Sequence, residues 1–481
     1  MTPGATYPPA MPPAALFIGG EWIERPRTHE VRNPLTGEPV GRIALGTTAD
    51  VATAAEAAAA AQAAEFPLLA RRHVLMGAAA LVEAHADEYA ETIAREGSKT
   101  IREARREPPR VAAILRLCAE EAARIGGETL PFGLRPGSEH RTGYYTRVPV
   151  GVVGAITPFN DPLAMVAHKV GPALAAGNSA VLKPATATPF SALRLARHLA
   201  DAGLPAGRLN VVTGPGGEIG EAIATHPGVR LLSFTGGVET GERLTRIAGI
   251  KKLSMELGSN SPVIVLADAD LDRAVPAIAD GAFTQAGQNC LGVQRVLVHA
   301  EVYDLFADRF VAHVRGLRPG ASTDEETDVC AMIDEGQAER VHAWIEEAVA
   351  GGARLLAGGS RQGALVPPTV LDRVPAGVRL DCDEVYGPVV SLYRVASLDE
   401  AIARANDVRY GLHAAIFTER LRDALDAAKR LDFGAVIVND STDYRLDVMP
   451  FGGTKLSGIG REGVRFAMQE MTETRVVCFN L

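Results

Sequence analysis

The sequence predicts an α/β protein built on parallel sheets that are covered by helices. Two observations carry this prediction: residues 48–124 show helical periodicity, and two later regions alternate short apolar runs with helical stretches. Alternation of that kind is typical of doubly wound parallel sheets. Because the chain has 481 residues, more than one ordinary core accommodates, we expect two or three domains.

Each region supports one part of that fold. Residues 48–124 carry Ala, Glu, Arg and Leu at helical spacing, which predicts amphipathic helices that form a scaffold. Residues 473–481 end the chain as an uncovered strand, which is expected to pair with an edge strand of another subunit. Between them the sequence predicts helices at 191–202 and 337–350 and strands at 147–156, 179–182, 209–212, 231–234, 261–266, 295–298 and 434–438.

Composition excludes several classes of function. The formal net charge is −9, which provides no broad basic field for a phosphate backbone, so no nucleic-acid partner is expected. Apolar runs end well before the roughly 18 residues that span a bilayer, so no membrane association is expected. The Pro- and Ala-rich residues 1–17 lack the pattern of a signal peptide and are interpreted as a flexible tail, which predicts a cytoplasmic protein.

The five cysteines are scattered along the chain, without the close pairs of a zinc site or a disulfide framework. We therefore expect reduced thiols and no metal. A lone cysteine is most often a buried packing residue. Cys290 differs because it follows Gly287, Gln288 and Asn289, a sequence rich in turn-forming and amide residues. An unperturbed thiol has a pKa of about 8.5, so a nucleophilic Cys290 would need a base or a favourable electrostatic site.

Seven short segments carry the functional prediction when they are taken together. In chain order they are TPFN at 157–160, LKP at 182–184, FTGG at 234–237, MELGSNSP at 255–262, GQNC at 287–290, EVYGPV at 384–389 and PFGGTKLSG at 450–458. Each segment alone is a weak signal. In this order and spacing they resemble the aldehyde dehydrogenase superfamily, and the resemblance runs from Phe17 to Leu481.

The resemblance implies the aldehyde dehydrogenase fold. A Rossmann-like cofactor-binding domain would take residues 1–125 and 147–255, and an α/β catalytic domain would take residues 256–462. A small β oligomerisation arm would combine residues 126–146 and 463–481. The implied assembly is a homodimer or a homotetramer.

The implied chemistry centres on Cys290, whose thiolate would attack a small-molecule aldehyde. Asn160 and the backbone N–H of Cys290 would stabilise the oxyanion, and such a donor is typically worth ~3 kcal/mol in the transition state. Asn160 is alternatively a turn or cap residue beside Pro162. Glu256 lies in an apolar run, where burial would raise its pKa toward the range of a general base. Its presence favours hydrolysis to a free acid over transfer to coenzyme A.

Two further residues, Lys169 and Glu462, match positions that the family uses as a proton relay to the base, and they could equally form a surface ion pair. The cofactor is NAD or NADP. FTGGVETG at 234–241 would place free N–H groups of a helix start at the pyrophosphate. The glycine pattern at 458–463 follows no strand and is interpreted as chance. The resemblance assigns cofactor contacts to Thr157, Pro158, Phe159, Lys183, Thr186, Gly216, Gly220, Phe234, Thr235, Gly236, Gly237, Thr240, Leu257, Glu384 and Tyr386.

Thr186 bears on the choice of cofactor. Members that prefer NAD usually carry a glutamate three residues after the lysine that corresponds to Lys183, and its carboxylate would repel a 2′-phosphate. Two like charges about 4 Å apart cost several kcal/mol at an intermediate dielectric constant. Threonine removes that repulsion and could donate a hydrogen bond to the phosphate. NADP is therefore permitted, and NAD is not excluded.

The substrate prediction rests on TPFNDPL and DYRLD, two segments that resemble the branch handling small polar or anionic aldehydes. The motifs are closest to those of phosphonoacetaldehyde and lactaldehyde dehydrogenases. Arg110 and Arg445 match positions that bind the anion, and a planar guanidinium suits phosphonate or carboxylate. Asn289 departs from this pattern because it stands where an arginine is expected, and Asp161 departs because histidine is common there and a carboxylate would oppose a doubly charged substrate.

Other interpretations remain open at this stage. Arg110 and Arg445 could be exposed helix and loop residues. A dehydrogenase of apolar or aromatic aldehydes is a second possibility, although aromatic residues make up only 5% of the chain. A third is a non-catalytic structural relative, which would be expected to lose Cys290 or Glu256.

Overall fold

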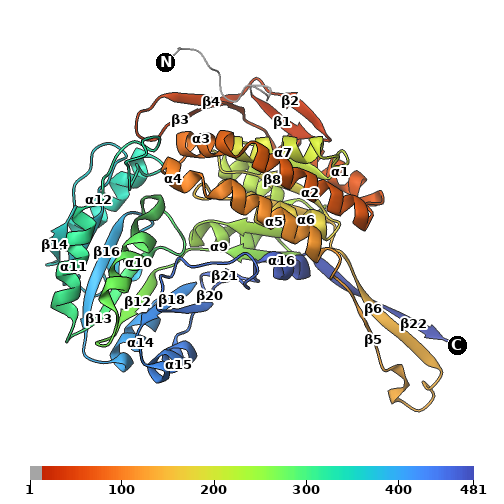
Figure 1. Cartoon of the computed structure of the whole chain (residues 1–481). Coiled ribbons are helices and arrows are strands. Elements are labelled where there is room, and N and C mark those ends of the chain that lie inside the picture. The colour runs from red at the N-terminus through yellow and green to blue at the C-terminus, as the bar shows by residue number, and fades with distance from the viewer. Residues whose placement is uncertain (1–13) are drawn as a thin grey trace.

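The structure is a computed structural model that describes residues 14–481, in which two α/β units lie beside each other and a narrow arm projects from one of them (Figure 1). Residues 1–13, which belong to the predicted N-terminal tail, lie outside the described residues. No helix in residues 14–481 is long and apolar enough to cross a membrane.

The first unit is built on an eight-stranded sheet with the order β2-β1-β9-β8-β7-β10-β11-β21. Its neighbours from β9 to β11 are parallel. The parallel part of the sheet begins in the middle with β7. It adds β8 and β9 on one side and then β10 and β11 on the other. The strands are β1 (Ala15–Ile18), β2 (Glu21–Glu24), β7 (Val152–Ile156), β8 (Ser179–Lys183), β9 (Leu209–Val211), β10 (Val229–Thr235), β11 (Lys252–Glu256) and β21 (Gly458–Ile459).

This strand order has a functional consequence. In a doubly wound sheet, ligands bind outside the carboxyl ends of the strands at the point where the order reverses. That point lies here between β7 and β10, so the segments that follow Ile156 and Thr235 face the same crevice. The N-terminal hairpin was not predicted, and it extends the sheet because Phe17 of β1 pairs with Val211 of β9.

The second unit is built on a seven-stranded sheet with the order β14-β15-β16-β13-β12-β18-β19. Buried aliphatic side chains from both faces of this sheet pack against the surrounding helices as one core. The strands are β12 (Ser261–Val265), β13 (Val293–His299), β14 (Arg354–Ala357), β15 (Thr369–Asp372), β16 (Val389–Val395), β18 (His413–Phe417) and β19 (Ala435–Val438). Smaller pairs are β3 (Thr28–Arg32) with β4 (Pro39–Ala44) and β17 (Tyr410–Gly411) with β20 (Thr454–Lys455).

Helices form where the periodicity predicts them. Residues 48–124 contain α1 (Thr48–Ala63), α2 (Leu68–Ala84), α3 (Ala86–Glu96), α4 (Ile101–Ala104) and α5 (Glu107–Glu121). The first unit adds α6 (Ala164–Ala175), α7 (Phe190–Asp201), η2 (Gly216–Gly220), α8 (Glu221–Thr225), α9 (Val238–Ile247) and α16 (Val464–Glu470). The second adds α10 (Leu271–Phe283), η3 (Thr284–Gly287), α11 (Tyr303–Arg315), α12 (Glu335–Ala350), α13 (Arg379–Cys382), α14 (Leu398–Asn406) and α15 (Leu421–Arg430).

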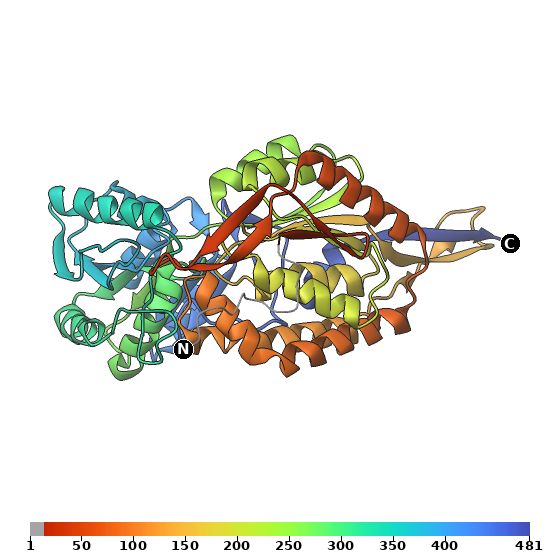
Figure 2. The same cartoon turned by 90° about the horizontal axis from the view of Figure 1, so that it is seen from above.

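The arm is a three-stranded sheet of β22 (Thr472–Asn480), β6 (Arg141–Pro149) and β5 (Glu128–Thr129), with η1 (Phe132–Leu134) between β5 and β6. It extends away from both units, as the view from above shows (Figure 2). The run predicted as one strand at 147–156 is split between β6 and β7 because Gly151 turns the backbone, with a φ of 121°. Helix α16, which the prediction assigned to the arm, packs instead against α6 of the first unit.

The C-terminal strand pairs first within its own chain, because β22 and β6 are antiparallel from Thr472↔Pro149 to Asn480↔Arg141. In the described chain no strand pairs with the other edge of β22. Val476, Phe479 and Leu481 are exposed along it, and Val476 is 58% exposed. An open edge with exposed apolar side chains is suited to pairing with another subunit. The limits of the three domains and the oligomerising role of the arm therefore remain proposals.

Substitution of Val476 by aspartate tests the role of the arm. Apolar contact across a subunit interface would be replaced by a buried charge, so we expect the solution mass to fall to a smaller assembly, as measured by light scattering after gel filtration. Leu305→Asp changes an equally exposed leucine of α11 and should leave the mass unchanged. A wild-type monomer, or an unchanged mass for V476D, would refute the predicted role.

Candidate active site

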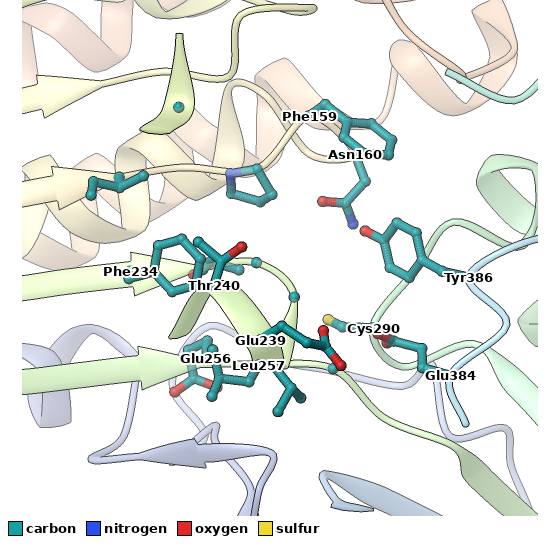
Figure 3. Close-up of a pocket in the computed structure, with 18 of the residues that line it drawn as sticks. Phe159, Asn160, Phe234, Glu239, Thr240, Glu256, Leu257, Cys290, Glu384 and Tyr386 are labelled. Carbon is teal, nitrogen blue, oxygen red and sulfur yellow. The ribbon is translucent and has the colours of Figure 1, made fainter. Parts of the chain in front are cut away.

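A cavity of about 830 Å³ lies between the two units. Its walls come from the segments after β7, β10 and β11 of the first sheet and from the segments before β13 and β16 of the second (Figure 3). Predicted site residues that line it are Thr157, Pro158, Phe159, Asn160, Lys183, Gly216, Gly220, Phe234, Thr235, Gly236, Gly237, Thr240, Glu256, Leu257, Cys290, Glu384 and Tyr386.

Cys290 is presented to this cavity by an unusual turn. Gln285, Ala286 and Gly287 all have left-handed backbones, with φ values of 58°, 54° and 67°. A side chain at Gly287 would collide with the carbonyl of Gly387. The turn reverses the chain after α10 and directs the Cys290 sulfur into the cavity (Figure 3). Non-glycine residues rarely adopt this conformation, and clusters of them are found at functional sites.

The Cys290 thiol is not a ready nucleophile by itself. Burial raises the pKa of the Cys290 thiol well above its usual value, and the nearby Arg445 guanidinium opposes only part of that shift. A thiol in such an environment is protonated at neutral pH. Its activation therefore requires a base that can accept the proton.

Glu256 is suited to that task. It ends β11, and neither carboxylate oxygen accepts a hydrogen bond from any residue in the described part of the chain. Burial raises the pKa of Glu256 well above the usual carboxyl value, and the charge of Glu462 adds to the shift. Gly452 allows this close packing, because a Cβ there would lie 3.0 Å from Glu256 Oε1. The carboxyl group is held dry and unpaired beside the cavity.

Asn160 lies in the loop after β7, directly behind Phe159, and is buried. Its Nδ2 donates to Gln285 Oε1 at 3.4 Å. Figure 3 shows the Asn160 amide directed into the cavity from the side opposite Glu256. Because the Cys290 sulfur also points into the cavity, an oxygen that forms on a carbon attached to this sulfur would meet the amide.

Lys169 and Glu462 form an ion pair, with Lys169 Nζ 2.8 Å from Glu462 Oε1. The pair is fully buried and is not the surface pair that the sequence left open. Burial favours protonation of Glu462, but Lys169 and Arg445 outweigh it and lower the pKa to about 2. The two residues lie behind Glu256 and do not line the cavity.

The part of the cavity that the sequence assigns to the cofactor contains polar groups that form no hydrogen bond, or only one, within the protein. Among residues 14–481, the buried hydroxyls of Thr157 and Thr235 have no hydrogen-bond partner. Glu384 accepts a hydrogen bond from the N–H of Ser259 at 2.8 Å, and burial raises the pKa of Glu384 to about 7. A side chain at Gly258 would collide with that carboxylate. These groups and the start of α9 after Gly237 fit a dinucleotide with hydroxyl and phosphate groups.

Lys183 and Thr186 are the two residues that the resemblance assigns to the adenosine side of the cofactor. Lys183 Nζ donates to the carbonyl of Pro184 at 2.8 Å, and burial lowers the pKa of Lys183 to about 8. Thr186 Oγ1 donates to the carbonyl of Gly214 at 2.7 Å and does not line the cavity. Its hydroxyl hydrogen is therefore engaged, unlike the free donor that the sequence predicted. This hydrogen bond does not change the other half of the argument: position 186 carries no carboxylate that would repel a 2′-phosphate.

The predicted substrate residues are not at the cavity wall but in a polar network beside it. Arg110 donates through Nε and Nη2 to Asp447, the latter at 2.9 Å. Asp161 pairs with Lys99, so it is not the uncompensated carboxylate that was expected. Asn289 donates to Asp443.

Among the predicted substrate residues, Arg445 has the largest electrostatic effect on the pKa of the Cys290 thiol. Its side chain is 8% exposed, and its guanidinium stacks on Phe451 at 3.7 Å from the ring centre. Nη2 donates to Glu462 Oε2 at 3.3 Å. Within the described residues Nε has no hydrogen-bond partner.

Sequence reasoning assigned no role to several members of this network, among them Lys99, Glu107, His168, Gln285 and Asp447. Lys99 is a lysine within an arginine-rich stretch, which is the one sign that it differs from its neighbours. His168 Nε2 donates to the Asp447 carboxylate at 3.0 Å, and His168 directly precedes Lys169 in the sequence. Gln285 and Asp447 lie inside or beside quoted motifs but carry no signal of their own.

Comparison with known proteins agrees with this geometry. A family model described as "Aldehyde dehydrogenase family" matches residues 22–477. The 3-sulfolactaldehyde dehydrogenase of Priestia aryabhattai is 45% identical over 97% of this chain and 98% of its own length. Aspartate-semialdehyde dehydrogenase 1 of Pseudomonas canavaninivorans is 46% identical over 94% of this chain and 96% of its own.

A solved structure extends the likeness to three dimensions. The NADP-dependent glyceraldehyde-3-phosphate dehydrogenase of Bacillus halodurans, in complex with NADP, has a TM-score of 0.95 and 37% identity, and the match covers 98% of this chain and 100% of that one. The predicted fold is therefore confirmed. The chain belongs to the aldehyde dehydrogenase family and is an oxidoreductase that oxidises an aldehyde with NAD(P).

Proposed function

We propose that the protein oxidises a small anionic aldehyde to its carboxylic acid by covalent catalysis on Cys290. The observation that carries this proposal is the shared cavity, into which Cys290, Asn160 and the unpaired carboxyl of Glu256 all open. A nucleophile, an oxyanion donor and a base are the three groups that acyl chemistry at an aldehyde carbon requires.

The first step forms a carbon–sulfur bond. Glu256 takes the thiol proton, and the Cys290 sulfur attacks the aldehyde carbon to give a thiohemiacetal. The oxyanion accepts hydrogen bonds from Asn160 Nδ2 and from the backbone N–H of Cys290. When bound, the nicotinamide of NAD(P) supplies the acceptor for the hydride.

The second step releases the product. Loss of the hydride leaves a thioester on Cys290, and Glu256 removes a proton from the attacking water so that the carbon–sulfur bond breaks to give the acid. A carboxylate with a raised pKa is a stronger base than an exposed one, which is why its unpaired burial is useful. Lys169 and Glu462 would pass the accepted proton onward from the rear of the base.

Residues of the cavity fit NAD(P) as the cofactor. Thr235, Gly236 and Gly237 would receive the pyrophosphate at the start of α9, and Glu384 would bind the nicotinamide ribose hydroxyls. Lys183 would hold the adenosine ribose. We propose that NADP is accepted well, because position 186 carries no carboxylate to repel its 2′-phosphate.

An anionic substrate is supported by Arg445. Arg445 lies beside the cavity and not in its wall. Its Nε donor is buried and unpaired among the described residues, and its charge is close enough to Cys290 to lower the pKa of the thiol. A buried guanidinium with a free N–H suits a carboxylate, sulfonate or phosphate oxygen. The aldehydes named for the three relatives carry a sulfonate, a carboxylate and a phosphate, and this shared chemistry supports the same class here.

Glu256→Gln tests the base and its protonation. Because a protonated carboxyl cannot accept a proton, the wild-type kcat should rise with pH through the raised pKa of Glu256 and then level off. E256Q should lower kcat by about 100- to 10,000-fold and remove that rise, since general bases typically contribute this much. Steady-state rates between pH 5 and pH 9 measure both effects. A variant that keeps the wild-type profile would exclude Glu256 as the base.

Arg445→Met tests the substrate class with a pair of aldehydes of similar size, succinic semialdehyde and butanal. Loss of a charge-assisted hydrogen bond is worth about 1.5–3 kcal/mol, or about 10- to 150-fold. We expect kcat/KM for the anionic aldehyde to fall by that factor, and kcat/KM for butanal to change much less. Equal losses for the two substrates would show that Arg445 acts on Glu462 or Cys290 and not on the substrate.

Thr186→Glu tests the cofactor proposal. A carboxylate near the 2′-phosphate should lower kcat/KM for NADP at least ten-fold through charge repulsion, whereas kcat/KM for NAD should be unchanged or higher. Initial rates with the two cofactors at fixed aldehyde provide the comparison, and Thr186→Gln is the uncharged control. The proposal is wrong if the wild type already prefers NAD strongly.

A further inference from the structure

A chain of hydrogen bonds leads from Lys99 to the amide of Asn160. Lys99, between α3 and α4, donates through Nζ to Asp161 Oδ1, and it also donates to Glu107 Oε2 at 2.6 Å. Gln285 Nε2 donates to the same oxygen of Asp161 at 3.0 Å. Asn160 Nδ2 donates to Gln285 Oε1 at 3.4 Å. These hydrogen bonds thus run from Lys99 and Asp161 of the first unit to Gln285, in the turn before Cys290, and return to Asn160 of the first unit.

Charge fixes the direction of every bond in this chain. Burial favours protonation of Asp161, but Lys99 and Arg110 outweigh it and lower the pKa of Asp161 to about 2. An ionised carboxylate can only accept hydrogen bonds. Gln285 must therefore turn its NH₂ group toward Asp161, which leaves its carbonyl oxygen facing Asn160.

The same logic fixes Asn160. A carbonyl oxygen at Gln285 requires a donor, so Asn160 must present Nδ2 and not Oδ1 on that side. An amide NH₂ has two hydrogens, and the second is then available for the oxyanion. A flipped amide would instead aim a carbonyl oxygen at the developing negative charge.

Gln285 is held firmly enough to transmit this constraint. Its backbone N–H donates to Glu103 Oε1 at 2.9 Å, and its side chain is buried. Its left-handed backbone belongs to the turn that presents Cys290. The same turn therefore contacts the Asn160 amide through Gln285 and carries Cys290 a few residues later.

We propose that Gln285 and Asp161 are positioning residues that orient the Asn160 amide so that its N–H faces the oxyanion. Asp161 is then not a substrate contact, which revises the expectation from the sequence. The inference rests on the proposed role of Asn160 as oxyanion donor. Its effect is confined to the transition state, because only there does the oxygen carry a full charge.

A double-mutant cycle tests the proposal, with kcat measured for Asn160→Ala, Gln285→Leu and the double variant. Removal of one oxyanion donor typically lowers kcat by about 100- to 1,000-fold. We expect Q285L to lower kcat about ten-fold or more without a matching change in KM for NADP. In the N160A background Q285L should lower kcat by less than three-fold, because no amide remains to be oriented. Gln362→Leu, on the surface, is the matched control and should retain wild-type activity.

The outcomes separate two kinds of failure. If N160A leaves kcat unchanged, the oxyanion role in the proposed function is wrong. If N160A lowers kcat but Q285L has no effect, or has the same effect in both backgrounds, only the positioning role is overturned. Thermal unfolding and NADP binding of each variant show whether the fold is retained.

Asp161 provides an independent test that does not require Q285L to fold. As a positioning residue, Asp161→Ala should lower kcat by a similar factor for succinic semialdehyde and butanal, and Asp161→Asn should recover part of the loss because its carbonyl oxygen can still accept from Gln285. As a substrate contact, Asp161 would repel the anion, so D161A would favour succinic semialdehyde selectively. That selective gain would overturn the proposal.

Discussion

The active site depends on a carboxyl group, that of Glu256, which is buried without a hydrogen-bond partner among the described residues. An ionised carboxylate in such a place costs several kcal/mol, so the group retains its proton more strongly than an exposed acid. Glu462, itself paired with Lys169, adds negative charge behind it and strengthens that tendency. Glu256 therefore has a high proton affinity for two reasons: its carboxyl group is buried, and the nearby Glu462 stays negatively charged because it is paired with Lys169.

Backbone packing keeps this carboxyl group dry. Strand β21 comes from the segment that follows the second sheet, yet it pairs with β11 of the first, with Glu256 opposite Gly458. Gly452 of the same segment approaches the carboxylate more closely than a side chain there would comfortably permit. The Glu256 carboxyl is therefore enclosed by a segment that returns from the second unit to the first sheet.

Many of the site residues proposed from the sequence line one cavity, because their motifs follow or precede strands at the reversal of the sheet order. TPFN follows β7 and FTGG begins at the end of β10, so topology alone brings them together.

The polar network around Asp161 could not be predicted from the sequence, for a physical reason. Asp161 meets Lys99 and Gln285 from 62 and 124 residues away, and buried polar contacts at such separations leave no periodic pattern. The resemblance placed β22 in one arm with residues 126–146, where it pairs with β6, whereas the strand pattern by itself did not specify this partner.

The ion pairs of this network also bear on substrate choice. They join four cations to four carboxylates and leave no net charge: Lys99, Arg110, Lys169 and Arg445 with Glu107, Asp161, Asp447 and Glu462. An anionic substrate is therefore not drawn in by an excess of positive charge. Recognition has to come from the position of an unused donor, and Arg445 Nε is such a donor. We infer that discrimination among anionic aldehydes depends on how far the charged group lies from the reacting carbon, because a single fixed N–H can meet it only at one distance.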